Sequence, residues 1–323
     1  MILSRRLIGF LLVVVVYSVT AKFPEQSVLF EGAYSENYIM RWHFQNLCHH
    51  VYDPHTNVYA WPSSPEGVTF NPREVKKGDL IFVRDVPRFM KKLHPKIKEP
   101  YIMVTAGECR DQVTPTHLKY LEDEKIVAWF AVHHDCMETH PKFHQLPLGI
   151  YQDRKYYEPR KELTHHFASL RAAPKTKLLY SNFGDLRGMK PERAEVVDYF
   201  ADKDYCFKVT DRLPFLEYMQ QMSEFKFSLS PRGYGPDTYR TWEALLVGSI
   251  PIVHTSQLDS LYADLPILII DRWDIITEEY LEKKYAEITQ KKWPIEKLFI
   301  EYWSQKIFKL REKFLRNTTQ ELV

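Results

Sequence analysis

The chain is poor in glycine, in cysteine and in net charge. It has 11 glycines in 323 residues, about half of the usual ~7%, so any cluster of glycines is informative. Its four cysteines, Cys48, Cys109, Cys136 and Cys206, are too few and too dispersed for a disulfide scaffold or a CxxC zinc module. Lysine plus arginine number 44 and aspartate plus glutamate 42, a formal net charge of +2, which argues against a dedicated nucleic-acid binder.

Apolar and aromatic side chains, in contrast, are abundant. Hydrophobic residues make up 45% of the chain, aromatic residues 14% and charged residues 27%, which is the profile of a globular protein and excludes a disordered or fibrous one. A chain of 323 residues is long for a single core and sufficient for two domains of ordinary size.

The N-terminus has the pattern of an export signal. Arg5 and Arg6 precede a nearly unbroken apolar run, Leu7–Val19, which is followed by the small residue Ala21. This pattern is typical of a cleaved signal peptide over residues 1–21 or of a short uncleaved signal-anchor, although the run is shorter than the ~20 residues of a comfortable membrane span. We therefore expect a secreted or periplasmic protein, or a single-pass type II membrane protein of the Golgi or ER lumen with one N-terminal membrane anchor.

Short apolar runs alternate with amphipathic segments in two sets, which predicts an α/β protein. Runs of this length bounded by turns are typical of buried parallel strands. The first set lies at 79–84, 101–105, 126–132 and 143–150, and the second at 177–181, 205–209, 225–230, 250–253 and 267–270. We expect an N-terminal α/β domain over 22–150, an irregular linker over 151–176, and a C-terminal domain over 177–323 that ends in helices.

Residues 225–253 (FKFSLSPRGYGPDTYRTWEALLVGSIPIV) contain three of the scarce glycines. The order is a strand, a Pro/Gly loop, a helix expected to start at Asp237 and to end at Gly248, and another strand. A loop that leads into a helix N-terminus is suited to bind an anion, because free N–H groups and the helix dipole both point to it. Arg232 in the loop adds a cation.

Arg240 and Glu243 lie three residues apart on one face of that expected helix. A cation in the first turn opposes the helix dipole unless an anion accompanies it, so Arg240 indicates a bound diphosphate. Glu243 could accept hydrogen bonds from a ribose diol, as an acidic residue does in dinucleotide folds. The alternative is a tight loop in which Arg240 and Glu243 merely pair with each other.

Three stretches of this segment, Phe227–Gly233, Tyr239–Leu245 and Gly248–Val253, resemble the signature of exostosin-type glycosyltransferases. The resemblance is good over 175–272, thinner over 79–150 and absent before residue 79. It implies a GT-B fold, in which two Rossmann-like domains face each other across a cleft and C-terminal helices pack back. It also implies a C-terminal domain that binds a nucleotide-sugar donor and an N-terminal domain that selects the acceptor.

Donor-binding residues can be carried over from that resemblance by position. It implies that Arg240 contacts the diphosphate, together with the helix terminus at Asp237, and that Glu243 contacts the ribose. The residues implied to shape the pocket are Ser230, Arg232 and Gly233, and Arg193 after the 180–184 segment (YSNFG) is a second candidate for a phosphate contact.

The implied function is inverting transfer of a sugar from a nucleotide-diphosphate donor to a glycan or glycoprotein acceptor. The first candidate for the donor is a UDP-sugar. We expect no cofactor and no metal, because GT-B enzymes generally use arginines and helix dipoles instead. Two alternatives stay open. One is a non-catalytic glycan-binding or accessory subunit with the same fold, and the other is a GT-B enzyme that uses a GDP-sugar, such as a fucosyltransferase.

Such a reaction needs a base for the acceptor hydroxyl, held across the cleft from the donor. The titratable residues at predicted strand ends of the first set are Asp85, Glu108, Asp111, His133, His134 and Asp135. We expect the base among Asp135, Glu108 and Asp111, with Asp135 first because it directly follows a strand. For each of them, an ordinary loop carboxylate is the alternative.

Two motifs contain residue types that bind metals, and the context of each argues against a metal site. His140 and His144 are four residues apart near Cys136, but Pro141 between them disfavours a regular helix. The formal Asp-x-Asp motif Asp202-Lys203-Asp204 lies between an expected helix and strand, away from the glycine loop, and we interpret it as a turn.

Overall fold

The computed structural model describes residues 23–24, 26–54, 67–106, 113–132, 136, 140–151, 160–184 and 191–320. Several positions singled out above lie outside the described residues: the apolar run Leu7–Val19, the expected bases Glu108, Asp111 and Asp135, and the neighbouring His133 and His134.

The first half of the chain forms a five-stranded parallel sheet in the order β4-β5-β6-β7-β8. Its strands are β4 (His50–Tyr52), β5 (Asp79–Val83), β6 (Tyr101–Thr105), β7 (Ile126–Ala131) and β8 (Phe143–Gln145). Every residue of β5 and β6 is buried, which is why these strands are continuous apolar runs in the sequence. The helices of this half are α1 (Arg41–Asn46), α2 (Val86–Lys92) and the 3₁₀ helices η2 (Pro72–Glu74), η3 (His94–Lys96) and η5 (Pro115–Glu122).

A second five-stranded parallel sheet follows, in the order β10-β9-β11-β12-β13. Its strands are β9 (Lys177–Ser181), β10 (Cys206–Lys208), β11 (Phe225–Leu229), β12 (Ile250–His254) and β13 (Leu268–Ile270). Its helices are α4 (Pro191–Phe200), α5 (Phe215–Ser223), α6 (Tyr239–Val247), α7 (Asp259–Tyr262) and η7 (Trp273–Ile275). The strand order reverses between β9 and β11, and parallel sheets bind ligands at such a switch point. The predicted α/β class with parallel sheets is confirmed.

The expected irregular linker over 151–176 contains a helix that the sequence interpretation missed. Helix α3 (Arg160–Ala172) buries Leu163, Phe167 and Leu170. These three residues recur at helical spacing and define an apolar stripe, which packs on the C-terminal half near α6 and α5. The polar residues around this stripe concealed it in the sequence.

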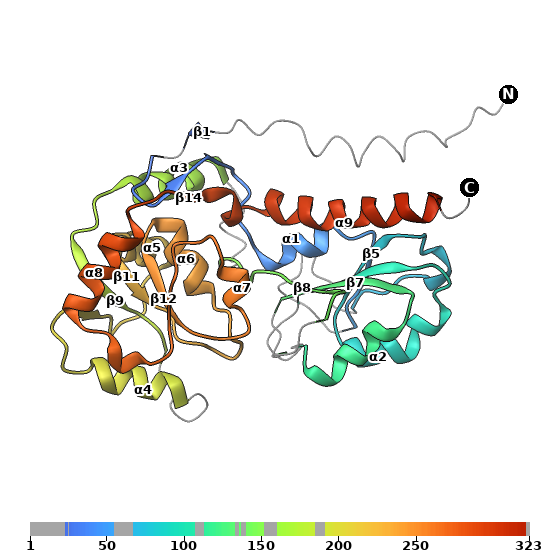
Figure 1. The fold of residues 1–323 in the computed structure, drawn as a ribbon, viewed down its shortest axis with the longest axis horizontal. Coiled ribbons are helices and arrows are strands. Elements are labelled where there is room, and N and C mark those ends of the chain that lie inside the picture. Colours follow the sequence, from blue (N-terminus) through green and yellow to red (C-terminus); the bar gives the residue numbers. More distant parts are fainter. Residues whose placement is uncertain are drawn as a thin grey trace.

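The C-terminal segment is divided into two helices, α8 (Glu278–Ile288) and α9 (Ile300–Gln320), with β14 (Trp293–Pro294) and η8 (Ile295–Leu298) between them. Short N-terminal strands, β1 (Phe23–Pro24), β2 (Phe30–Glu31) and β3 (Ala33–Tyr34), lie on this part of the chain, where β2 pairs with β14. Helix α9 starts near the junction of the two halves and runs along the N-terminal half (Figure 1), where Arg311 Nε donates to the Gly78 carbonyl at 2.7 Å.

Among the described residues, no helix is both long and apolar enough to cross a membrane. The expectation of a single-pass type II membrane protein is therefore corrected. Helix α9, at 21 residues, has the length of a span, but Lys309, Arg311 and Glu312 are among the charged side chains distributed along it.

Candidate functional site

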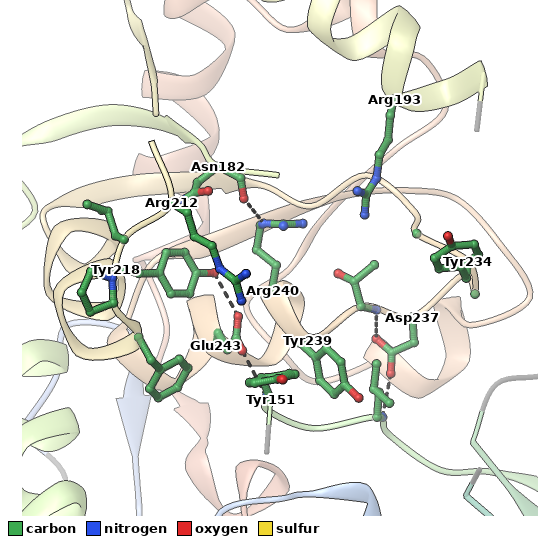
Figure 2. Close-up of a pocket in the computed structure, with 17 residues that line it drawn as sticks. Tyr151, Asn182, Arg193, Arg212, Tyr218, Tyr234, Asp237, Tyr239, Arg240 and Glu243 are labelled. Atoms are coloured by element: carbon green, nitrogen blue, oxygen red, sulfur yellow. Dashed lines mark hydrogen bonds between the residues drawn. The ribbon is translucent and has the colours of Figure 1, made fainter. Parts of the chain in front are cut away.

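A cavity of about 740 Å³ opens at the switch point of the second sheet (Figure 2). Asn182 from the end of β9 forms one wall, and residues 233–243 of the glycine loop and the first turns of α6 form another. The loop before α5 contributes residues 212–215, and the N-terminal half contributes Leu148 and Tyr151. Both halves of the chain therefore line the cavity.

Two arginines from different helices converge in this cavity. The guanidinium carbons of Arg240 (α6) and Arg193 (α4) lie 5.5 and 5.6 Å from the ring centroid of Phe183. Arg240 Nε donates to the Asn182 carbonyl at 2.6 Å, and Arg193 Nη1 donates to the Gly184 carbonyl at 2.8 Å. Backbone carbonyls and one aromatic ring thus hold both cations in place.

Neither arginine has an ion pair with a carboxylate in the part of the chain that the structure describes. Burial, together with the neighbouring charge of Arg240, lowers the pKa of Arg193 to about 10. Two like charges that share a partly buried site repel each other, and an anion placed between them relieves the repulsion. The arrangement is therefore suited to bind a phosphate or diphosphate.

The glycine loop passes close to these cations. A Cβ atom added at Gly233 would lie 3.1 Å from Arg193 Nη2, and Arg193 Nε donates to the Arg232 carbonyl at 3.0 Å. A side chain at position 233 would therefore crowd the guanidinium. Gly233 also lines the cavity, and its role in shaping the pocket stays a prediction.

Ser230 and Arg232 lie beside the main cavity and not in its wall. The Ser230 hydroxyl is buried and bonds to the hydroxyls of Thr238 and Thr241 at 2.9 and 2.8 Å. Ser230 and Arg232 line a separate hollow of about 40 Å³ next to His254. Their contribution to the main cavity is indirect, through the conformation of the loop.

Helix α6 begins at Tyr239, two positions later than expected, with Thr238 as the N-cap residue. The Asp237 carboxylate is buried and accepts hydrogen bonds from Leu148 N at 2.8 Å, Trp242 Nε1 at 2.9 Å and Tyr262 Oη at 3.0 Å. The Asp237 carboxylate therefore accepts hydrogen bonds from these three donors instead of capping α6. Asp237 bridges the two halves of the chain at the cavity.

Burial raises the pKa of Asp237 to about 6 from its ordinary value of 3.8, against the opposing effect of its hydrogen bonds. Between these values the folded state holds a proton that the unfolded state has lost, so stability falls as pH rises through this window. We expect the unfolding free energy of the wild type minus that of Asp237→Asn to fall by about 2 kcal/mol between about pH 4 and pH 7. Urea titrations at both pH values measure it, and a constant difference would contradict it.

Glu243 is also buried, with 5% exposure, and both of its oxygens have protein donors. Tyr151 N donates to Oε1 at 3.1 Å, and the Tyr218 hydroxyl donates to Oε2 at 3.0 Å. Burial raises its pKa, whereas these bonds and the charge of Arg240 lower it. No ion pair joins Arg240 to Glu243, so the alternative of a self-paired Arg240 and Glu243 is not what the structure has.

Of the base and metal candidates, only some lie in the described residues. Asp85 is the N-cap of α2 and accepts from Arg88 N at 3.2 Å. His144 stacks on Phe130 with ring centroids 4.7 Å apart, and Asp202 lies in a turn, as predicted, with its carboxylate 3.0 Å from Lys203 Nζ. The described residues contain no group of three or more His, Cys, Asp or Glu side chains that could hold a metal ion.

Several cavity residues escaped the sequence interpretation. The YSNFG segment contains Asn182 and also Phe183, which lies under the two arginines, but no pattern marks either as a site residue, and none predicts Arg212, Tyr151 or Tyr218. Arg212 is exposed in the loop before α5, where nothing in the local pattern distinguishes it from other surface arginines. These residues become recognisable only when the loops that carry them meet.

Comparisons with known proteins do not show which family the chain belongs to. No family model and no curated protein matches the chain. Among solved structures, the chain is similar to one in the crystal structure of the GtfA/B complex, with 12% identity, a TM-score of 0.33, and coverage of 75% of this chain and 55% of that chain. A likeness this weak carries no argument, and the resemblance to exostosin-type enzymes stays a prediction.

Proposed function

We propose that this chain transfers a sugar from a nucleotide-diphosphate donor to a glycan or glycoprotein acceptor. The observation that carries the proposal is the pair Arg193 and Arg240, two cations fixed around one aromatic ring without a carboxylate ion pair in the described residues. Their cavity lies at the N-terminus of α6 and at the switch point of a parallel sheet, where anions and nucleotides bind.

In this proposal, the arginines act on the leaving group. Negative charge develops on the diphosphate as the bond to the sugar breaks, and cations already held in place stabilise that charge without reorganising. The acceptor attacks from the opposite face, and Asp135, Glu108 or Asp111 takes the proton of its hydroxyl. The two parallel sheets form the two domains of a GT-B arrangement, and the donor binds to the second.

A thermal-unfolding screen of the purified chain against UDP, GDP, CMP and their sugars, with and without Mn²⁺, tests the proposal. At about a hundredfold excess over Kd, the bound nucleotide should stabilise the fold by roughly 2.7 kcal/mol. Stabilisation by UDP without metal is the expected result. Stabilisation by GDP alone would favour a GDP-sugar enzyme, and a response to glycans but to no nucleotide would contradict the proposal in favour of an accessory subunit.

A further inference from the structure

We infer that Tyr151 is a ligand-binding residue of this cavity and that Glu243 and Asp237 are positioning residues that hold it there. The inference rests on the proposed nucleotide site and differs from the ribose contact that the exostosin resemblance implies for Glu243.

Residues 148–151 are anchored by hydrogen bonds from both halves of the chain. On the side of the C-terminal half, Leu148 N donates to Asp237 Oδ2 at 2.8 Å and Tyr151 N donates to Glu243 Oε1 at 3.1 Å. On the other side, Ile150 N donates to the carbonyl of Ile39 at 2.9 Å. Three backbone N–H groups of residues 148–151 are thus held from two sides, and the two carboxylates hold the N-terminal half against the start of α6.

The Tyr151 ring lies at the wall of the cavity. It is 45% exposed, lines the cavity and meets Tyr239 edge-on, with ring centroids 5.5 Å apart at 86°. Figure 2 shows both rings beside Glu243. An exposed aromatic ring whose backbone is fixed at a cavity wall offers a preorganised face to a planar base or to the CH face of a sugar.

Glu243 already has hydrogen-bond partners within the protein. Its carboxylate is buried, and protein donors occupy both of its oxygens, Tyr151 N on one and the Tyr218 hydroxyl on the other. A ribose diol would have to add further donors to a group that already has its partners and almost no exposed surface. Glu243 therefore acts on the ligand through the residues that it holds.

Tyr151→Ala gives the direct test, because an exposed ring can be removed without emptying the core. Calorimetric titration with UDP should show a Kd about tenfold higher than that of the wild type, on the scale of one lost stacking partner. Tyr302→Ala, which removes another part-exposed tyrosine away from the cavity, is the matched control and should keep the wild-type Kd. An unchanged Kd in Tyr151→Ala would overturn the inference.

Two double-perturbation cycles then distinguish a positioning role of Glu243 from direct contact with the ribose. If Glu243 acts through Tyr151, Glu243→Ala should weaken UDP binding about tenfold in the wild type and less than about twofold in the Tyr151→Ala background. The loss should be the same for UDP and 2′,3′-dideoxy-UDP. A loss that persists without the Tyr151 ring but disappears with the dideoxy nucleotide would assign Glu243 to the ribose and overturn the inference.

Glu243→Gln is a second test variant in case Glu243→Ala fails to fold. Its amide oxygen can still accept from Tyr151 N, so we expect near-wild-type affinity, whereas a tenfold loss that depends on the ribose hydroxyls would again overturn the inference. The proposed function fails separately, because it fails if the wild-type protein binds no nucleotide at all.

Discussion

Replacing Arg240 with alanine should lower turnover by about 10²-fold or more, the scale of one lost transition-state donor. The guanidinium donates to the Asn182 carbonyl and lies over the Phe183 ring, as that of Arg193 also does. In the proposed reaction, its charge is therefore in place before negative charge develops on the diphosphate. Release of UDP from a UDP-sugar measures the effect.

Two companion variants distinguish a specific loss from a general one. Arg240→Lys keeps the charge but loses the planar fork that can bind two phosphate oxygens at once, so it should restore only part of the turnover. Arg316→Ala removes an exposed arginine from α9 and should leave turnover unchanged. Near-normal turnover in Arg240→Ala would remove Arg240 from the mechanism.

Gly149→Ala should destabilise the fold by about 3 kcal/mol or more, through a left-handed backbone and a backbone clash together. Gly149 has φ +75°, and a Cβ atom there would lie 2.2 Å from the carbonyl oxygen of Ile39 and 2.6 Å from its carbonyl carbon. Both are backbone atoms, which cannot rotate away as a side chain can. Urea unfolding followed by circular dichroism measures the loss.

The matched control is Gly184→Ala. A Cβ atom at Gly184 would meet nothing within 4 Å, and its φ lies outside the left-handed region, so we expect a change within about 0.5 kcal/mol. If Gly149→Ala were equally mild, residues 148–151 would be able to shift, and the rigid placement of Tyr151 would be contradicted.

Patterns within a few residues of each other were enough to predict much of the fold. Continuous apolar runs marked β5, β6 and β7, because strands buried on both faces have no polar alternation. Gly248 marked the end of α6, where it adopts φ +77°, because glycine takes that conformation without strain. The glycine loop and Arg240 likewise pointed to an anion site through local geometry alone.

Sequence patterns did not predict the partners that lie far away along the chain. Asp237 was expected at the helix N-terminus, but its carboxylate bonds to Leu148 N, 89 residues away. Glu243 bonds to Tyr151 N, 92 residues away. Arg193 and Arg240 lie on different helices and meet only because β9 and β11 are neighbours in the sheet.

The sequence by itself therefore determined most of the strands and helices, with α3 as an exception, and where a loop could bind an anion. These properties depend on the spacing of apolar residues and on backbone preferences, which act over a few positions. Only the tertiary structure decided which cations share the cavity, which carboxylates are already occupied, and that Tyr151 from the first half forms a wall of a site in the second. Those choices depend on which sheet edges and loops meet in space, and no local pattern encodes that meeting.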